Sequence, residues 1–203
     1  MTSSRYAFLW VLPFVLACGD NSTPADGSVA SDVPDQGDAS DSDAGSDVGG
    51  EDAGPDILDL DMRAEDFVCI RDGEKVRKFY VTNPLGFLDE ALAVANSSEG
   101  GTYPVGTVLQ LVPLEAMVKR HAGWNPDTND WEFFSLDVRA GETTILARGA
   151  TDVINAFGGS CFGCHSLAAP EWDLVCEDTH GCDPLPLSTE VIESFQNADS
   201  RCE

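Results

Sequence analysis

The stretch WEFFSLDV, at residues 131–138, combines aromatic and aliphatic side chains in a partly alternating pattern that is typical of a β-strand. The turn residues NPDTND (125–130) precede it, and RAGE (139–142) joins it to a second apolar run, TTILA (143–147). Two further strands are predicted at residues 78–82 (KFYVT) and 107–112 (TVLQLV). The sequence therefore predicts a sheet of about four or five strands.

Three short helices complete the predicted domain. The first spans residues 84–96, with Asn83 as its N-cap. The others span residues 151–157, which end at a pair of glycines, and 189–197, which follow Ser188 as a cap. Strands and helices together predict an α+β fold class, a strand-rich single domain with a few short helices.

The composition limits the possible partners. The chain has 203 residues, enough for one domain with appendages, and 42% of them are hydrophobic, which is enough for a core. Its net charge is −25, from 11 Lys and Arg against 36 Asp and Glu. Because nucleic-acid binding needs a basic surface for the phosphates, nucleic acids are excluded as partners.

Much of the negative charge lies in the segment 19–62. Residues 20–62 contain twelve Asp and one Glu but neither Lys nor Arg, and Ser, Gly, Ala and Pro make up most of the remainder. Such a composition buries too little apolar surface to offset the entropy of ordering, so a disordered, extended tether is predicted. Repeated DxD spacing leaves cation binding as an alternative, although no calcium-loop glutamate follows it. The folded domain is accordingly placed at residues 63–203.

Residues 1–18 have the features of a lipoprotein export signal. Arg5 precedes an apolar core of 11 residues, 7–17, which is too short to span a membrane. The sequence VLACG (15–19) resembles a bacterial lipobox, in which the cysteine, here Cys18, is joined to diacylglycerol. The alternative is an ordinary secretory signal with a chance cysteine. The lipobox predicts a lipid-anchored protein on the periplasmic side of a membrane or at the cell surface.

The motif CFGCH, at residues 161–165, is the strongest chemical signal in the chain. Two cysteines separated by two residues and followed by histidine are typical of covalent haem c attachment. Cys161 and Cys164 would form thioethers with the haem vinyl groups, and the adjacent His165 would bind the iron as the proximal ligand. A disulfide within the motif and a zinc site that includes His180 are the alternatives.

Four exported cysteines lie outside this motif, and an oxidising compartment favours their pairing as disulfides. Two disulfides allow three connectivities, and the sequence alone does not choose among them. A metal cluster at CEDTHGC (176–182) is an alternative with irregular zinc spacing. The four disulfide candidates are Cys69, Cys176, Cys182 and Cys202.

The order of several short segments resembles the cytochrome P-460 family. These segments are GTYPVGTV (101–108), WEFF (131–134), CFGCH (161–165) and WDLV (172–175), and the resemblance covers about residues 79–176. It implies a β-rich fold with one covalent haem c, whose iron is five-coordinate and open to small nitrogen ligands. Members of this family oxidise hydroxylamine or bind nitric oxide.

The sequence departs from the catalytic members of that family at one position. In them a lysine from the strand just after the Gly-Thr segment is cross-linked to the porphyrin, whereas here this stretch reads QLV (110–112). Lys119 follows several residues later, and we expect its side chain to be exposed. The missing cross-link argues against hydroxylamine oxidation but not against haem binding or gas binding. Enzymatic activity therefore stays open, and no catalytic residue is assigned.

The sixth coordination position of the iron has three candidate side chains, His121, His180 and Met117. We expect both histidines at the surface, and Met62 is set aside because it ends the tether. An open distal site is therefore predicted, and the aromatic residues 131–134 would form one wall of it. The alternative is that these aromatic residues pack only in the core.

Three classes of function follow from these features. The first is a P-460-like haem protein that performs redox chemistry or binds small nitrogenous ligands. The second is a mono-haem electron-transfer protein with a redox partner protein, in which a sixth ligand holds the iron. The third is a haem-free interaction lipoprotein stabilised by disulfides. All three share membrane lipid as a partner through Cys18.

Overall fold

The computed structural model describes residues 58–185 and 187–202. Its centre is a six-stranded antiparallel sheet in which every strand pairs with the next one along the chain. The strands are β1 (Glu74–Val76), β2 (Phe79–Thr82), β3 (Val108–Gln110), β4 (Glu115–Lys119), β5 (Trp131–Arg139) and β6 (Glu142–Gly149). The α-helices are α1 (Leu88–Ala95), α2 (Cys161–His165) and α3 (Thr189–Asn197). This confirms the predicted strand-rich α+β fold class.

Strand β5 is the most deeply buried part of the sheet, and its residues Trp131 to Leu136 are all buried. Because successive side chains of a strand point to opposite faces, Phe133 enters one hydrophobic cluster and Phe134 enters the other. Burial on both faces explains why the stretch alternates only partly between apolar and polar residues.

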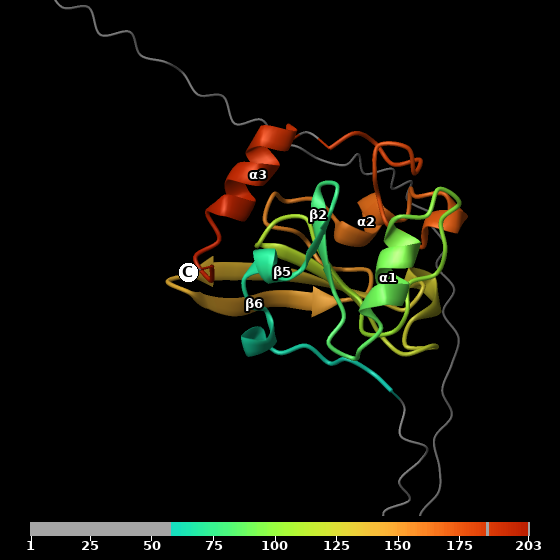
Figure 1. Cartoon of the computed structure of the whole chain (residues 1–203), viewed down its shortest axis with the longest axis horizontal. Coiled ribbons are helices and arrows are strands. Elements are labelled where there is room, and N and C mark those ends of the chain that lie inside the picture. The colour runs from blue at the N-terminus through green and yellow to red at the C-terminus, as the bar shows by residue number, and fades with distance from the viewer. Residues whose placement is uncertain (1–57, 186, 203) are drawn as a thin grey trace, which may run out of the picture. The chain divides into compact units, whose positions relative to one another are not determined.

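The two faces of the sheet are covered by different parts of the chain. The first cluster joins the sheet to α1 and α2 and consists of Val76, Phe79, Val81, Ala91, Ala95, Tyr103, Leu109, Met117, Trp131, Phe133, Val153, Cys161 and Val175. The second joins it to the segment that precedes β1 and consists of Met62, Phe67, Val108, Ala116, Val118, Phe134 and Leu136. In Figure 1 α2 and α3 lie above the β5–β6 hairpin and α1 lies to its right, while the first part of the teal segment runs below it.

A buried carboxylate binds the segment that precedes β1 to the second face. Glu132 of β5 is 3% exposed and pairs with the guanidinium groups of Arg120 and Arg148. Arg120 also donates to Asp59, with a distance of 3.0 Å from Nε to Oδ1, and Arg148 Nη1 donates to the Met62 carbonyl at 2.9 Å. A buried charge is tolerated at moderate cost only when it is paired. Burial of Glu132 therefore depends on both arginines, which in turn bind the segment that precedes β1.

The N-terminal boundary predicted for the folded domain was therefore too late. Residues 58–62 were assigned to the tether, but Met62 is 2% exposed within the second cluster. The acidic composition concealed this because Asp59 and Asp61 pair with Arg120 and Arg148, which lie far along the chain. The other predicted tether residues, 19–57, lie outside the described residues.

The predicted strands at 78–82, 107–112, 131–138 and 143–147 are confirmed as β2, β3, β5 and β6, whereas β1 and β4 were not anticipated. The predicted helix 84–96 begins later, at Leu88, because Asn83 Oδ1 accepts hydrogen bonds from the backbone of Leu85 and Phe87 and so stabilises a turn.

The other two predicted helices had opposite outcomes. The helix predicted at 151–157 was wrong, because Asn155 Oδ1 accepts from Phe157 and Gly159 and again forms a turn. The helix at 189–197 is confirmed, with Ser188 as its N-cap. Among the described residues, no helix has the length and apolar character needed to cross a membrane.

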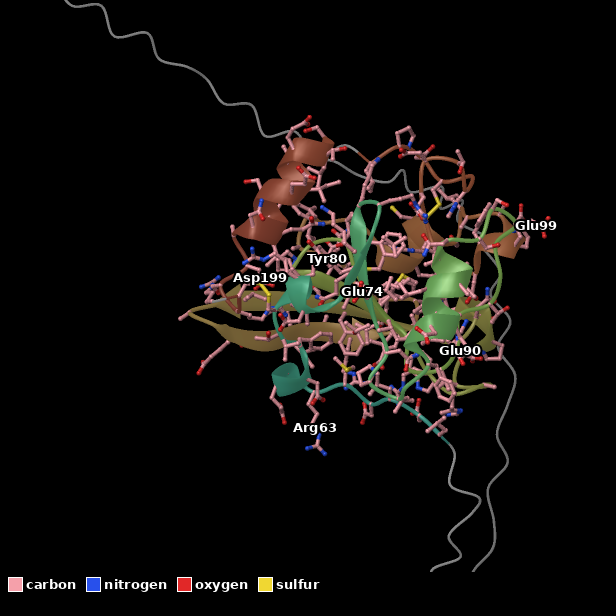
Figure 2. All side chains as sticks on the ribbon, viewed as in Figure 1. Arg63, Glu74, Tyr80, Glu90, Glu99 and Asp199 are labelled. Carbon is pink, nitrogen blue, oxygen red and sulfur yellow. A yellow bond between two sulfur atoms is a disulfide. The ribbon has the colours of Figure 1, made fainter. Side chains whose placement is uncertain are left out.

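The four disulfide candidates pair as Cys69–Cys202 and Cys176–Cys182, with Cα–Cα distances of 4.7 and 5.6 Å. Asp199 lies beside the first of these, as Figure 2 shows, and its carboxylate accepts from the backbone of Ile70 at 3.0 Å. The first disulfide spans a sequence separation of 133 residues and the second one of 6. Loop-closure entropy predicts stabilisation of about 5 kcal/mol for the long loop and about 2 kcal/mol for the short one.

Candidate functional site

The CFGCH motif forms α2, a helix of 5 residues on the same side of the sheet as α1 (Figure 1). Ser160 is its N-cap, since Ser160 Oγ accepts from the backbone of Gly163 at 3.0 Å. The Cys161 backbone donates to the Val153 carbonyl at 3.0 Å, which attaches the start of the helix to the preceding loop. Cys161 is buried in the first cluster, and His165 at the other end is half-buried.

The imidazole of His165 is held by a main-chain carbonyl. Its Nδ1 lies 2.7 Å from the Leu174 oxygen, and its ring centroid lies 5.2 Å from that of Phe133. A proton on Nδ1 donated to this carbonyl leaves the lone pair on Nε2, which is the usual arrangement for a histidine that binds a metal. Burial lowers the pKa of His165, and the Leu174 carbonyl opposes that effect. The site thus favours a neutral ring with the lone pair on Nε2.

The two cysteines of the motif are in different states. Cys161 is the free thiol among the cysteines of the described residues, whereas Cys164 is disulfide-bonded. The alternative of a disulfide between Cys161 and Cys164 is therefore wrong. Burial and, to a smaller extent, the nearby carboxyl of Glu115 raise the pKa of the Cys161 thiol to about 12, so the thiol stays protonated near neutral pH.

Glu115, the first residue of β4, was not anticipated as part of this region. Its Oε1 is buried and is without a hydrogen-bond partner among the described residues. Burial raises the pKa of this carboxyl to about 7 from an ordinary 4.5. A buried carboxyl oxygen without a hydrogen bond destabilises a core. Glu115 Oε1 is such an atom among the described residues, and it lies near the thiol of Cys161.

Lys119 is not exposed, contrary to the sequence-based expectation. Its side chain is 7% exposed, and Nζ lies 2.9 and 2.7 Å from the two carboxylate oxygens of Asp173. Nζ also donates to the Asn129 carbonyl at 2.7 Å and lies 5.0 Å from the Trp131 ring centroid. The buried carboxylate that retains Lys119 in the interior lies 54 residues away in sequence.

His180 is likewise buried, at 7% exposure, rather than at the surface as expected. Its ring stacks on Trp172 with centroids 3.8 Å apart, and Nδ1 lies 2.6 Å from the Val175 oxygen. The neighbouring cysteines 176 and 182 form a disulfide, as expected, so the alternative of a metal cluster at 176–182 is wrong. The group Cys69, Asp199 and Cys202 could hold a metal by distance alone, but its two sulfurs are bonded to each other.

The remaining ligand candidates lie in different surroundings. His121 follows β4 and is half-buried, with Nδ1 3.1 Å from the Ala122 oxygen. Met117 is 5% exposed and pairs across the sheet with Phe133, the residue whose ring lies against His165. Of the three candidates for a sixth ligand, Met117 is therefore the one that shares a cluster with Cys161 and a neighbour with His165.

Large apolar side chains lie exposed on both sides of α2. Ile154, which forms a bridge with Ser160, is 53% exposed, and Phe157 is 42% exposed. On the other side Leu167 is 48% exposed, and its backbone donates to the Cys164 carbonyl. These three side chains flank the motif in sequence, and the ring of Phe157 also packs against that of Phe195 with centroids 5.9 Å apart.

Replacement of Glu115 by Gln is expected to flatten the dependence of stability on pH. Since the pKa of Glu115 is raised in the fold, the contribution of Glu115 to stability is greatest below about pH 4.5 and is lost as pH rises to about 7, by at most about 3 kcal/mol. Denaturant unfolding of the full chain at pH 5 and pH 8 measures this loss, which should be smaller in Glu115→Gln. The exposed Glu99 (Figure 2) provides the matched control Glu99→Gln. An identical loss in wild type and Glu115→Gln would contradict the assignment.

The site therefore combines a predicted helical motif with three groups that sequence reasoning missed: Glu115, the Leu174 carbonyl and the Lys119–Asp173 pair. The segment WDLV was noted for its order, but its spacing carried no sign that it would contact His165. Comparison of the chain with protein-family models, with curated proteins and with solved structures finds no match.

Proposed function

We propose that the protein is an exported, lipid-anchored haem protein that resembles cytochrome P-460 and carries one covalent haem c. The observation that carries the proposal is the bond from His165 Nδ1 to the Leu174 carbonyl at 2.7 Å, directly after the two cysteines of α2. This contact gives the histidine the tautomer and fixed ring that a proximal haem ligand requires.

The donor set of this region fits haem c in three respects. Cys161 and Cys164 lie one helical turn apart at the start and near the end of α2, and His165 ends that helix. Exposed apolar side chains surround the motif, and a porphyrin would cover such surface favourably. Glu115, whose Oε1 has no hydrogen-bond partner among the described residues, provides a polar group near Cys161.

Attachment requires thiols at both cysteines. Each thiol would add across one vinyl group, so that S–H and C=C bonds are replaced by C–S and C–H bonds without a net redox change. Cys164 must first be released from its disulfide by a dithiol reductant, which supplies two electrons and is itself oxidised to a disulfide. Haem bound in this way supplies one-electron redox chemistry and a position for a small ligand such as nitric oxide or hydroxylamine.

The membrane partner is proposed to be lipid bound through Cys18, on the periplasmic side or at the cell surface. Cys18 and the acidic tether lie outside the described residues. An acylated cysteine followed by a long acidic segment would hold the folded domain away from a lipid surface, to which its negative charge is not attracted. A redox partner protein could then reach the haem domain.

Electron transfer is the second candidate function, and buried Met117 is the side chain that we propose as its sixth ligand. A thioether sulfur is a common sixth ligand of cytochromes c, and Met117 is next to Phe133 in the cluster that contains Cys161. Redox chemistry or nitrogen-ligand binding needs that position open, whereas electron transfer needs it filled. The haem-free interaction lipoprotein is the third possibility and is decided by the presence of covalent haem.

Covalent haem is expected in protein made with a haem-attachment system, detected by haem staining after denaturing electrophoresis. Cys161→Ala and Cys164→Ala should each retain one thioether, and the double variant should retain none. The paired variant Cys176→Ser with Cys182→Ser is the control and should keep its haem. Wild type without covalent haem would leave the interaction lipoprotein as the function, and haem retained by the double variant would refute the attachment site.

The state of the sixth position is tested by the resting absorption spectrum and by addition of nitric oxide. For an open site we expect a high-spin spectrum that nitric oxide changes rapidly and that Met117→Ala leaves unaltered. His121→Ala and His180→Ala serve as controls and should also have no effect. A low-spin spectrum that becomes high-spin in Met117→Ala would assign the protein to electron transfer.

Membrane attachment is expected to depend on Cys18 and not on haem. Cys18→Ser should move the protein from the membrane fraction to the soluble fraction while covalent haem and cooperative unfolding are retained. Fractionation followed by immunoblotting measures the distribution. A Cys18→Ser protein that stays with the membranes would mean that another segment or a partner holds it there.

A further inference from the structure

Two residues between η4 (Pro170–Trp172) and the second cysteine pair have an unusual backbone conformation. Asp173 and Leu174 have φ angles of 50° and 62°, the left-handed region that side chains other than glycine rarely adopt. Neither residue is glycine, so the surrounding structure must hold them in this conformation.

The side chain of Asp173 is the main group that holds them. It is 4% exposed and accepts from Lys119 Nζ on both oxygens, and the Tyr103 backbone donates to Oδ2 at 2.9 Å. The main-chain carbonyl of Asp173 accepts from Trp131 Nε1 at 2.7 Å. Strands β4 and β5, through Lys119 and Trp131, thereby fix both the side chain and the carbonyl of one residue.

The next carbonyl along the chain is the one that binds the histidine of α2. Leu174 O lies 2.7 Å from His165 Nδ1, and the Val175 backbone donates back to Trp172 O at 2.9 Å. A fixed Asp173 peptide and a closed turn leave the Leu174 carbonyl with one orientation. The contacts between Lys119 and Asp173 therefore help to fix the orientation of the carbonyl that binds the imidazole of His165.

We propose that Lys119 and Asp173 are positioning residues for His165, which act by holding the Leu174 carbonyl against Nδ1. This inference rests on the proposed function, since it assigns the two residues a role toward the proximal ligand of a haem. The carbonyl fixes the tautomer and the ring plane of His165, and its acceptor strength raises the donor strength of Nε2. Because Lys119 neutralises Asp173, the segment presents a dipole to the histidine rather than a net charge.

The test replaces both charges at once by groups of similar size, in the double variant Lys119→Met with Asp173→Asn. Removal of one partner alone would leave an uncompensated buried charge and could prevent folding. The matched control is the double variant Arg201→Met with Asp199→Asn, a buried pair beside the Cys69–Cys202 disulfide whose carboxylate likewise accepts a backbone N–H. Trp131→Phe is a milder second variant that removes only the bond to the Asp173 carbonyl.

Two spectroscopic readouts are used. In the haem-free full chain, the ¹⁵N shifts of His165 should report an Nδ1–H tautomer in wild type and in the control, and a mixture of tautomers in the Lys119–Asp173 variant. In haem-loaded protein, the iron–histidine Raman band of the ferrous state should move to lower wavenumber in that variant while covalent haem is retained. Trp131→Phe should change both signals in the same direction as the Lys119–Asp173 variant, but by a smaller amount.

The outcomes separate this inference from the proposed function. Wild type without covalent haem would refute the function, while the ¹⁵N readout would still decide whether the pair positions His165. A folded Lys119–Asp173 variant with the wild-type tautomer and Raman band would overturn the inference. So would equal changes in the Arg201–Asp199 control, because general loosening would then explain them. If the double variant does not fold, unchanged signals in Trp131→Phe overturn the inference.

Discussion

Strand β5 has large apolar side chains on both faces, and each face must be shielded from water by another part of the chain. The helices and the loops around α2 shield the face of Phe133, while the segment before β1 shields the face of Phe134. A meander in sequence order leaves both faces open to such coverage, since none of its connections needs to cross the sheet. The position of the functional motif follows from this need for cover.

The two faces differ in how they accommodate polar groups. On the face of Phe134, Glu132 is neutralised by Arg120 and Arg148, and the resulting network binds an N-terminal segment. On the face of Phe133, the Lys119–Asp173 pair lies under the chain that contacts His165. Buried ion pairs contribute little net stability compared with apolar packing. Their value in this fold lies in specifying which segment covers which face.

Sequence reasoning succeeded where a structure depends on neighbours in the chain. The strands at 131–138 and 143–147 and the capped helix at 189–197 all have local signals. β4 was missed because its sequence, EAMVK, places Glu115 and Lys119 on the inward face, where a periodic pattern would have apolar residues. The helix expected at 151–157 failed because a single asparagine side chain favoured a turn.

The parts of the site that could not be predicted depend on distant partners. Burial of Lys119 requires Asp173, and burial of His180 requires the ring of Trp172. The acceptor for His165 is a main-chain carbonyl, which every residue possesses, so no residue type identifies it beforehand. The four cysteines outside the motif could be counted but not paired, and the choice among three pairings came only from their positions in space.

The Cys69–Cys202 disulfide joins the start of the domain almost to its end, so nearly the whole domain is one covalent ring. A protease that cuts a single exposed loop within that ring opens it without releasing a fragment, and both pieces stay joined to the N-terminal segment. Loss of material from the domain therefore requires two cuts. A domain cut once within the ring would therefore remain one covalent molecule.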